Sequence, residues 1–106
     1  MEAKKKYELT NETIEFNGTI LHQIKALRSF GKVKAGCLGG WVEKEENLSQ
    51  MGYAWVYSNA KVYGNAKVFG NAEIYGESMV YGDAQVYGRA RVFGNAIVFG
   101  DSKVGG

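Results

Sequence analysis

The second half of the chain repeats a six-residue unit without interruption. In residues 56–103 a β-branched residue opens each unit, and tyrosine or phenylalanine follows it. In most units the next residues are glycine, then asparagine or aspartate, then alanine or serine. The openings are Val56, Val62, Val68, Ile74, Val80, Val86, Val92 and Val98. Self-similarity at a fixed period is typical of repeat architectures, in which each unit contacts mainly its neighbours. We therefore expect a solenoid.

Each unit combines a short extended stretch with a corner. In the stretch 66–69, β-branched and aromatic residues favour a strand. Alternation sends its alanine and valine to one face, and its lysine and phenylalanine to the other. Gly70 and Asn71 then supply the corner, because both tolerate left-handed backbone angles. So short a strand cannot bury its apolar face alone. Three strands are therefore expected to form a triangular coil, with successive coils stacked at about 4.8 Å.

The units resemble the hexapeptide repeat of left-handed parallel β-helices. In that family an aliphatic residue recurs every sixth position with a small residue two before it, as in Ala60-Lys61-Val62. The strict match covers residues 54–106, and the VYGNA-type units also resemble repeat proteins of bacteria and their phages. The resemblance implies an all-β fold, a left-handed parallel β-helix of about three to four triangular coils. The left hand comes from the resemblance alone, because parallel crossovers are generally right-handed.

Residues 1–35 are expected to form an N-terminal β-hairpin cap. Asn17 and Gly18 lie between the apolar stretches 13–16 and 19–22, which is a strong hairpin signal. The apolar spacing within 19–28 also fits a short helix, and a strand is the preferred interpretation. The hairpin is expected to cover the open end of the solenoid, since terminal repeats need caps to be soluble.

The β-helix is expected to span residues 36–106, with an irregular first coil at 36–55 and regular coils at 56–106. Gly40 and Val42 take the small and aliphatic positions, and Leu48 follows Val42 by six residues. The step from Leu48 to Val56 is eight, which indicates a two-residue insertion. At the other end we expect an uncapped last coil that presents unpaired backbone groups and apolar interior, including Val104, to solvent or to a partner.

Residues eighteen positions apart share an outward face. Two faces, one of them beginning with Trp55, carry a charged or amide side chain beside nearly every aromatic ring. The third carries one charge and five apolar or aromatic side chains. These residues are Lys61, Tyr63, Met79, Tyr81, Ile97 and Phe99.

Rings stacked one coil apart explain the recurring aromatics but not Met79 and Ile97. Either the N-terminal segment or a second chain is expected to cover this face, and a second chain is preferred because methionine and aromatic residues are enriched in interface cores. The predicted interface residues are Tyr63, Met79, Tyr81, Ile97, Phe99 and Val104.

These observations predict a non-catalytic protein-interaction module that self-associates as a dimer or trimer. The resemblance extends to trimeric acyltransferases, which usually use a histidine as general base between subunits. The single histidine here, His22, precedes the repeat, and no acid is identifiable that would orient it toward Cys37. No metal-ligand spacing occurs, and no cofactor is expected. Acyl transfer is therefore the weaker alternative.

A further alternative is a small phage-encoded inhibitor that binds a host defence protein, such as a nuclease, through its aromatic faces. The 13 basic and 11 acidic residues give no strong case for nucleic acid as a partner. No apolar run approaches the roughly 20 residues that a membrane span needs. A single cysteine fits a reducing cytoplasm, that of the bacterial host if the protein is phage-encoded.

Overall fold

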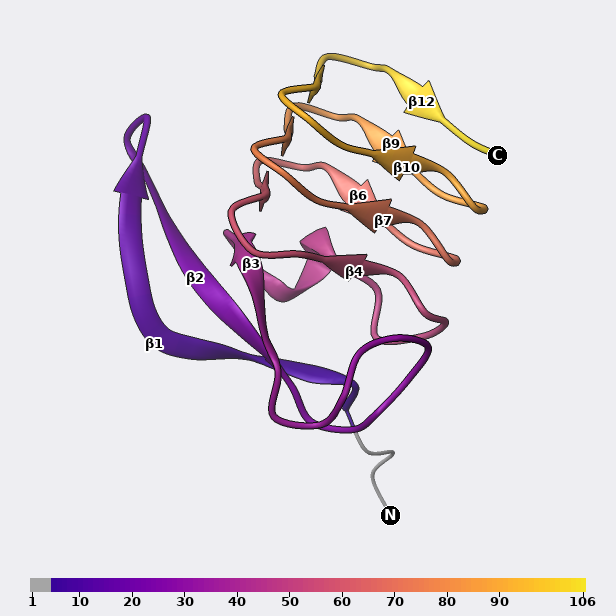
Figure 1. The fold of residues 1–106 in the computed structure, drawn as a ribbon. Coiled ribbons are helices and arrows are strands. Elements are labelled where there is room, and N and C mark those ends of the chain that lie inside the picture. The colour runs from indigo at the N-terminus through magenta and orange to yellow at the C-terminus, as the bar shows by residue number, and fades with distance from the viewer. Residues whose placement is uncertain (1–4) are drawn as a thin grey trace.

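The computed structural model describes residues 5–106, and the chain from residue 55 onward winds into a stack of three-sided coils (Figure 1). Short strands form the walls of these coils. They are β4 (Trp55–Val56), β5 (Lys61–Val62), β6 (Lys67–Val68), β7 (Glu73–Ile74), β8 (Met79–Val80), β9 (Gln85–Val86), β10 (Arg91–Val92), β11 (Ile97–Val98) and β12 (Lys103–Val104). Each strand ends on valine or isoleucine, whose branched Cβ favours an extended backbone.

Strands eighteen residues apart pair in parallel, which turns the repeat into three flat walls. One sheet contains β4, β7 and β10, the second contains β6, β9 and β12, and β5, β8 and β11 belong to the third. The register aligns like with like, so that Val62 lies opposite Val80 and Val80 lies opposite Val98. Backbone bonds join the coils throughout, for example from Lys61 N to Ser78 O at 3.0 Å. The predicted stack of parallel coils is confirmed.

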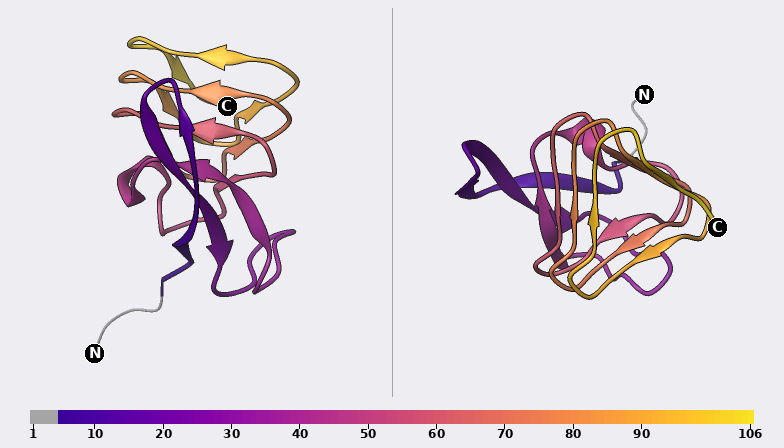
Figure 2. Two further views of the ribbon diagram at one scale, coloured as in Figure 1. Left: turned by 90° about the vertical axis from the view of Figure 1, so that its left-hand side faces the viewer. Right: turned by 90° about the horizontal axis from the view of Figure 1, so that it is seen from above.

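The coils are left-handed, as the resemblance implied. Viewed from the C-terminal end, the outline is triangular and the chain runs clockwise as it rises toward the viewer (Figure 2, right). The general right-handed preference applies to twisted strands joined by a long crossover. Two-residue strands joined by tight corners are too short to twist appreciably. The right-handed preference, which arises from strand twist, is therefore weak in this solenoid.

Valine, isoleucine and alanine fill the interior of the triangle. Val56, Val62, Ile74 and Val80 have no exposed surface, and the alanines two positions before each valine are nearly as buried up to residue 90. Ser78 replaces one of these alanines, and its hydroxyl donates to Tyr75 O at 2.9 Å. The buried hydroxyl of Ser78 is therefore satisfied, as buried polar groups generally are.

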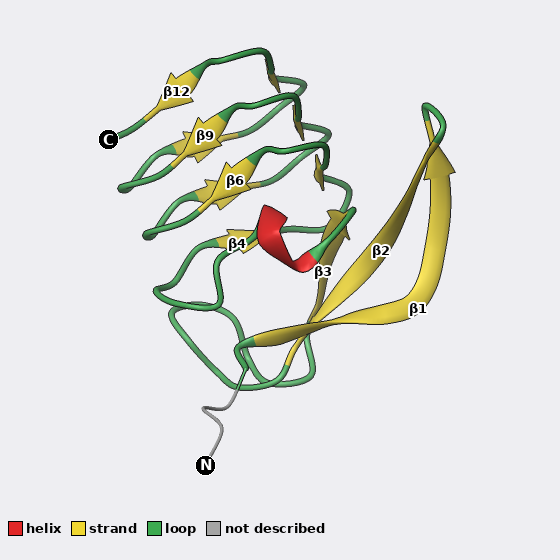
Figure 3. Ribbon diagram, turned by 180° about the vertical axis from the view of Figure 1, so that it is seen from behind, coloured by secondary structure: helices red, strands yellow, loops and turns green. Residues whose placement is uncertain are grey.

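The first coil is irregular and contains β3 (Leu38–Val42) and the 3-10 turn η1 (Glu45–Asn47), red in Figure 3. Val42 pairs with Val62, and Leu48 pairs with Val68, which confirms the predicted interior register. The amide of Asn47 fixes the turn, because its Oδ1 accepts from Lys44 N at 2.9 Å and its Nδ2 donates to Ala66 O at 2.9 Å. Among residues 5–106 there is no helix with the length and apolar character that a membrane span needs.

An antiparallel hairpin of β1 (Tyr7–Phe16) and β2 (Thr19–Ala26) precedes the solenoid. Asn17 and Gly18 form its turn at positive φ angles of 51° and 81°. The strand interpretation of residues 19–26 is therefore confirmed over the helical one. Strand β2 also pairs with β3, so that the hairpin continues the β3–β5–β8–β11 wall of the solenoid.

The base of the hairpin and the loop after it close the N-terminal end of the solenoid. Tyr7, Ile24, Phe30 and Val33 are buried in the same core cluster as the valines of the coils. The predicted cap is thus present. Beyond it, the hairpin continues upward beside the coils, so that its tip stands next to one wall (Figures 1 and 2).

Trp55 lies in this cap and not on an outward surface. Its position in the repeat is an outward one, yet only 1% of its surface is exposed. The rings of Tyr7 and Phe30 cover it, with centroids 6.1 and 5.3 Å away and both at edge-on angles. The expectation of an outward Trp55 was therefore wrong, because the segment before the repeat folds over the first coil.

A buried lysine, Lys6, donates hydrogen bonds to backbone carbonyls in the segment that contains the two-residue insertion of the first coil. The Nζ atom of Lys6 donates to Ala54 O at 2.7 Å and lies 5.0 Å from the centroid of the Phe30 ring. It is also 3.4 Å from Gly52 O. Burial, and then the nearby Arg28 charge, lower the pKa of Lys6 from 10.5 to about 8. The carbonyls of Gly52 and Ala54 thus face a cation inside the cap.

These groups predict a maximum of stability near pH 10. The pKa of Lys6 is lower in the folded chain than its ordinary 10.5, so the unfolded chain binds more protons and stability rises from pH 8 upward. Burial raises the pKa of Tyr7 and raises that of Tyr57 to about 12, from an ordinary value of 10.0. Above pH 10 the folded chain therefore binds more protons, and stability falls.

Urea unfolding at pH 7.5, 9.5 and 11 measures this dependence. The rise contributed by one lysine is at most about 1.4 kcal/mol per pH unit. We expect Lys6→Met to abolish the rise while keeping the fall, and Tyr7→Phe to make the fall shallower. A steady loss of stability from pH 8 upward in the unmutated protein would contradict the prediction.

Candidate functional site

The wall formed by β5, β8 and β11 carries a continuous row of aromatic rings on its outer side. Tyr63 stacks on Tyr81 at a centroid distance of 5.1 Å and an angle of 9°, and Tyr81 stacks on Phe99 at 5.7 Å and 15°. Met79 and Ile97 lie opposite each other in the same register. We call this surface, made of Lys61, Tyr63, Met79, Tyr81, Ile97 and Phe99, the ladder face.

The structure brings together five of the six predicted interface residues and places the sixth elsewhere. Val104 lies on β12, in a different wall, and its half-buried side chain packs against the core. Val104 occupies an interior position of the repeat, like Val86, with which it pairs in the coil below. Strands β10, β11 and β12 each form one edge of their sheet in the described chain.

The hairpin covers the lower part of the ladder face and leaves the upper part exposed. The Phe16 ring lies edge-on to Tyr63 at 5.9 Å, and Lys61 Nζ is 5.0 Å from the centroid of the Phe16 ring. Met79 and Tyr81 are half-buried, whereas Ile97 and Phe99 are 50% and 56% exposed. The N-terminal segment therefore covers the first coil of this face, and the last coil of the face is uncovered.

Polar corners border the ladder face on both sides. On one side, Asn59 Nδ2 donates to Glu77 Oε2 at 3.2 Å. On the other side, Asn65 Nδ2 donates to Asp83 Oδ1 at 3.2 Å, and Asp101 follows one coil further on. The border of the apolar strip thus carries Glu77 on one side and Asp83 and Asp101 on the other, and we call these three residues the acidic rim.

The other two walls also carry stacked rings, but these have charged neighbours. Phe69 stacks on Tyr87 at 5.3 Å, beside the outward Lys67 and Gln85. Tyr75 stacks on Phe93 at 5.8 Å, beside an ion pair between Glu73 and Arg91. Ring stacking is thus a general feature of this solenoid, and the apolar ladder face is distinguished by Met79 and Ile97.

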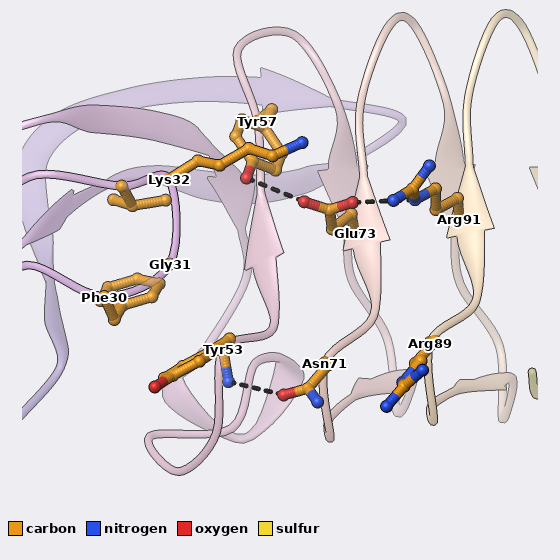
Figure 4. A pocket seen from close by; sticks show the side chains of 10 residues that line it. Phe30, Gly31, Lys32, Tyr53, Tyr57, Asn71, Glu73, Arg89 and Arg91 are labelled. Carbon is orange, nitrogen blue, oxygen red and sulfur yellow. Dashed lines mark hydrogen bonds and ion pairs between the residues drawn. The ribbon is translucent and has the colours of Figure 1, made fainter.

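A pocket of about 250 Å³ lies between the loop 27–36 and the wall of β4, β7 and β10 (Figure 4). Its lining comprises Phe30, Gly31, Lys32, Val33, Tyr53, Tyr57, Asn71, Glu73, Arg89 and Arg91. A second hollow adjoins it and shares Lys32, Tyr57, Glu73 and Arg91.

Some polar side chains of the pocket bind one another, whereas others form no ion pair within the described chain. The Glu73 carboxylate accepts from the Tyr57 hydroxyl at 3.2 Å and pairs with Arg91 Nε at 3.1 Å. Burial, and then the Glu73 charge, raise the pKa of Tyr57 to about 12, so the phenol stays neutral at ordinary pH. Within residues 5–106, neither Lys32 nor Arg89 forms an ion pair.

Sequence reasoning missed this pocket. Lys32 belongs to a loop without any repeat, and nothing in the sequence places that loop over a particular wall. One signal was present in Arg89, which occupies a corner position where most units have asparagine or aspartate.

The structure does not bring His22 and Cys37 together. His22 lies opposite Val42 in the sheet, and its Nδ1 is 3.1 Å from Thr10 O on the neighbouring strand. Cys37 is exposed and lies beyond the far end of that pairing, where its carbonyl accepts from Ala26 N. In the part of the chain that is described, no three His, Cys, Asp or Glu side chains are grouped so as to hold a metal ion.

The fold and the repeated surface define a β-solenoid repeat protein. In agreement, residues 84–100 and 90–106 match the family model described as YdcK beta solenoid repeat. The chain is also 39% identical over 61 residues to the uncharacterized acetyltransferase YdcK of Escherichia coli (strain K12). That similarity covers 50% of this chain and 19% of the relative, so the chain matches about a fifth of the relative's length.

Proposed function

We propose that this chain is a protein-binding β-solenoid that self-associates through its ladder face. The observation that carries the proposal is the exposure of Ile97 and Phe99, which continue the apolar strip of Met79 and Tyr81. Contiguous apolar patches bordered by polar residues are typical of protein contact sites. Aromatic residues and methionine are also the side chains enriched in the centres of such sites.

The charges beside the ladder face favour a second copy of the chain as the partner, and they favour contact with a different wall of that copy. A stable interface buries about 800 Å² on each partner, so we expect the contact to extend beyond Ile97 and Phe99 to the acidic rim. Two ladder faces placed together would bring Asp83 and Asp101 of each copy near like charges. The wall of β6, β9 and β12 offers the opposite charge through Lys67 and Lys103.

We therefore favour contact between the ladder face of one copy and the lysine-bearing wall of the next. Contacts between two different surfaces of the same chain generate closed rings when the rotation permits. Such a contact is not two-fold symmetric, so a closed ring needs at least three copies, and for this reason we favour a trimer over a two-fold dimer.

Light scattering coupled to size-exclusion chromatography, at about 10 and about 300 μM protein, tests the proposal. We expect a mass above that of the monomer at the higher concentration and a lower mass for Ile97→Asp. The control is Phe93→Asp, which also replaces an exposed apolar side chain by a carboxylate, but on the wall of β4, β7 and β10, outside both surfaces of the proposed contact. Raising the salt concentration should also weaken association, because it screens the contacts between rim and lysines.

Two outcomes would contradict self-association. One is a monomer at both concentrations, and the other is an oligomer that Ile97→Asp leaves unchanged. A monomer that retains one stoichiometric host protein, and loses it on Ile97→Asp, would instead support the inhibitor hypothesis.

Acyl transfer is a second candidate, and one comparison favours it: the relative that matches half of this chain is named an acetyltransferase. The test is release of coenzyme A from acetyl-CoA by the full chain in the presence of small amines. Turnover that is lost in His22→Ala would support acyl transfer. Turnover that persists in that variant would place the chemistry at another residue, and absence of turnover would count against this candidate.

A further inference from the structure

We infer that the pocket between the loop 27–36 and the β4–β7–β10 wall binds a small phosphate monoester. This site is separate from the ladder face and does not depend on self-association. The inference rests on the unequal charge of the pocket, on the arrangement of its hydrogen-bond donors, and on its aromatic wall.

The pocket holds two positive charges that the described chain does not balance. Its charged side chains are Lys32, Arg89, Arg91 and Glu73. Glu73 is already engaged by Arg91 at 3.1 Å and by the Tyr57 hydroxyl at 3.2 Å. Lys32 and Arg89 therefore remain, and Figure 4 shows them coming from opposite sides, one from the loop and one from a corner of the solenoid. A ligand that complements them carries two negative charges.

The donors suit a tetrahedral group of oxygen atoms. Arg89 provides a planar fork of N–H groups, which matches phosphate oxygens, and Lys32 provides a compact ammonium group. Asn71 uses its Oδ1 to accept from Tyr53 N at 3.2 Å, and this orients its amide nitrogen as a further donor. Donors that approach from several directions match the oxygens of a phosphate better than those of a single flat carboxylate.

The remaining lining is aromatic and accommodates the organic part of the ester. The rings of Phe30 and Tyr53 are stacked with centroids 6.5 Å apart and form one wall. The volume of about 250 Å³ is below the roughly 300–1,000 Å³ of pockets that take drug-sized ligands, so a small ester fits best.

Titration of the full chain with phenyl phosphate, followed by amide chemical shifts at constant ionic strength, tests the site. We expect saturable shifts at Gly31, Tyr53, Asn71 and Arg89. Lys32→Gln and Arg89→Gln should each weaken binding at least tenfold. Lys34→Gln is the matched control, because it removes the same charge from the same loop outside the pocket lining, and it should change the affinity less than twofold. Inorganic phosphate should bind at the same residues, but more weakly.

Several outcomes would overturn the inference. Shifts that do not saturate, or that spread over exposed lysines, would show that phosphate meets only a general positive surface. Equal effects of Lys32→Gln and Lys34→Gln would show the same. Tighter binding of succinate than of phenyl phosphate would reassign the pocket to dicarboxylates. Loss of phosphate binding in Ile97→Asp would contradict the independence of this site from the ladder face.

Discussion

Replacing Val68 by aspartate is expected to unfold the protein, whereas the same replacement at the adjacent Lys67 should leave it folded. Val68 is 1% exposed and lies in the interior between Leu48 of the coil below and Val86 of the coil above. Lys67 is exposed on the outer side of the same strand. The two variants therefore place the same carboxylate on opposite sides of one wall.

The size of the effect follows from the cost of burying a charge. An unpaired carboxylate in an apolar interior costs several kcal/mol even when it escapes by taking up a proton. The total stability of a domain of this size is about 5–15 kcal/mol. We expect Val68→Asp to lose its cooperative thermal transition by circular dichroism, and Lys67→Asp to keep it within a few degrees. Two variants with the same melting temperature would contradict the assignment of inner and outer positions.

The second large effect is expected at the corners, where Gly82→Ala should destabilise the protein far more than Gly100→Ala. Both glycines have positive φ angles, 72° and 65°, so both alanines bear the strain of a left-handed backbone. A Cβ atom on Gly82 would lie 2.9 Å from Gly100 N in the coil above. A Cβ atom on Gly100 would meet no atom within 4 Å.

The pair therefore separates local strain from the close approach of stacked coils. The left-handed conformation costs about 1–2 kcal/mol. For a domain of this size, about 1 kcal/mol corresponds to roughly 4–8 °C in melting temperature. We expect a drop of about 5–10 °C for Gly100→Ala and at least twice that for Gly82→Ala. Equal drops would show that the strain at the corner, and not the spacing of the coils, accounts for the glycines.

Much of the fold could be predicted because the repeat makes it a local problem. Six residues and their repeated neighbours are enough to determine the strand at 67–68, the inward direction of Val68 and the corner at Gly70. The same reasoning sorted the outward residues into three walls, correctly except for the buried Trp55, and placed Tyr63, Met79, Tyr81, Ile97 and Phe99 together. Asn17 and Gly18 located the hairpin for a similar reason, since a tight turn is set by its own residues.

The parts that could not be predicted lie where a segment without repeats meets the solenoid. The sequence indicated a cap but not that Tyr7 and Phe30 would cover Trp55, nor that the charge of Lys6 would lie among the carbonyls of the first coil. It also did not indicate that the hairpin tip would reach Tyr63 and leave Phe99 open.

The sequence by itself determined the period, the inward row of valines and the apolar character of one wall, because each follows from alternation along a short strand. Only the tertiary structure decided which coil of that wall is uncovered and where a pocket with Lys32 and Arg89 forms. Those features depend on how the loop 27–36 and the hairpin pack against the coils. That packing results from contacts between residues distant in sequence, for which no local pattern exists.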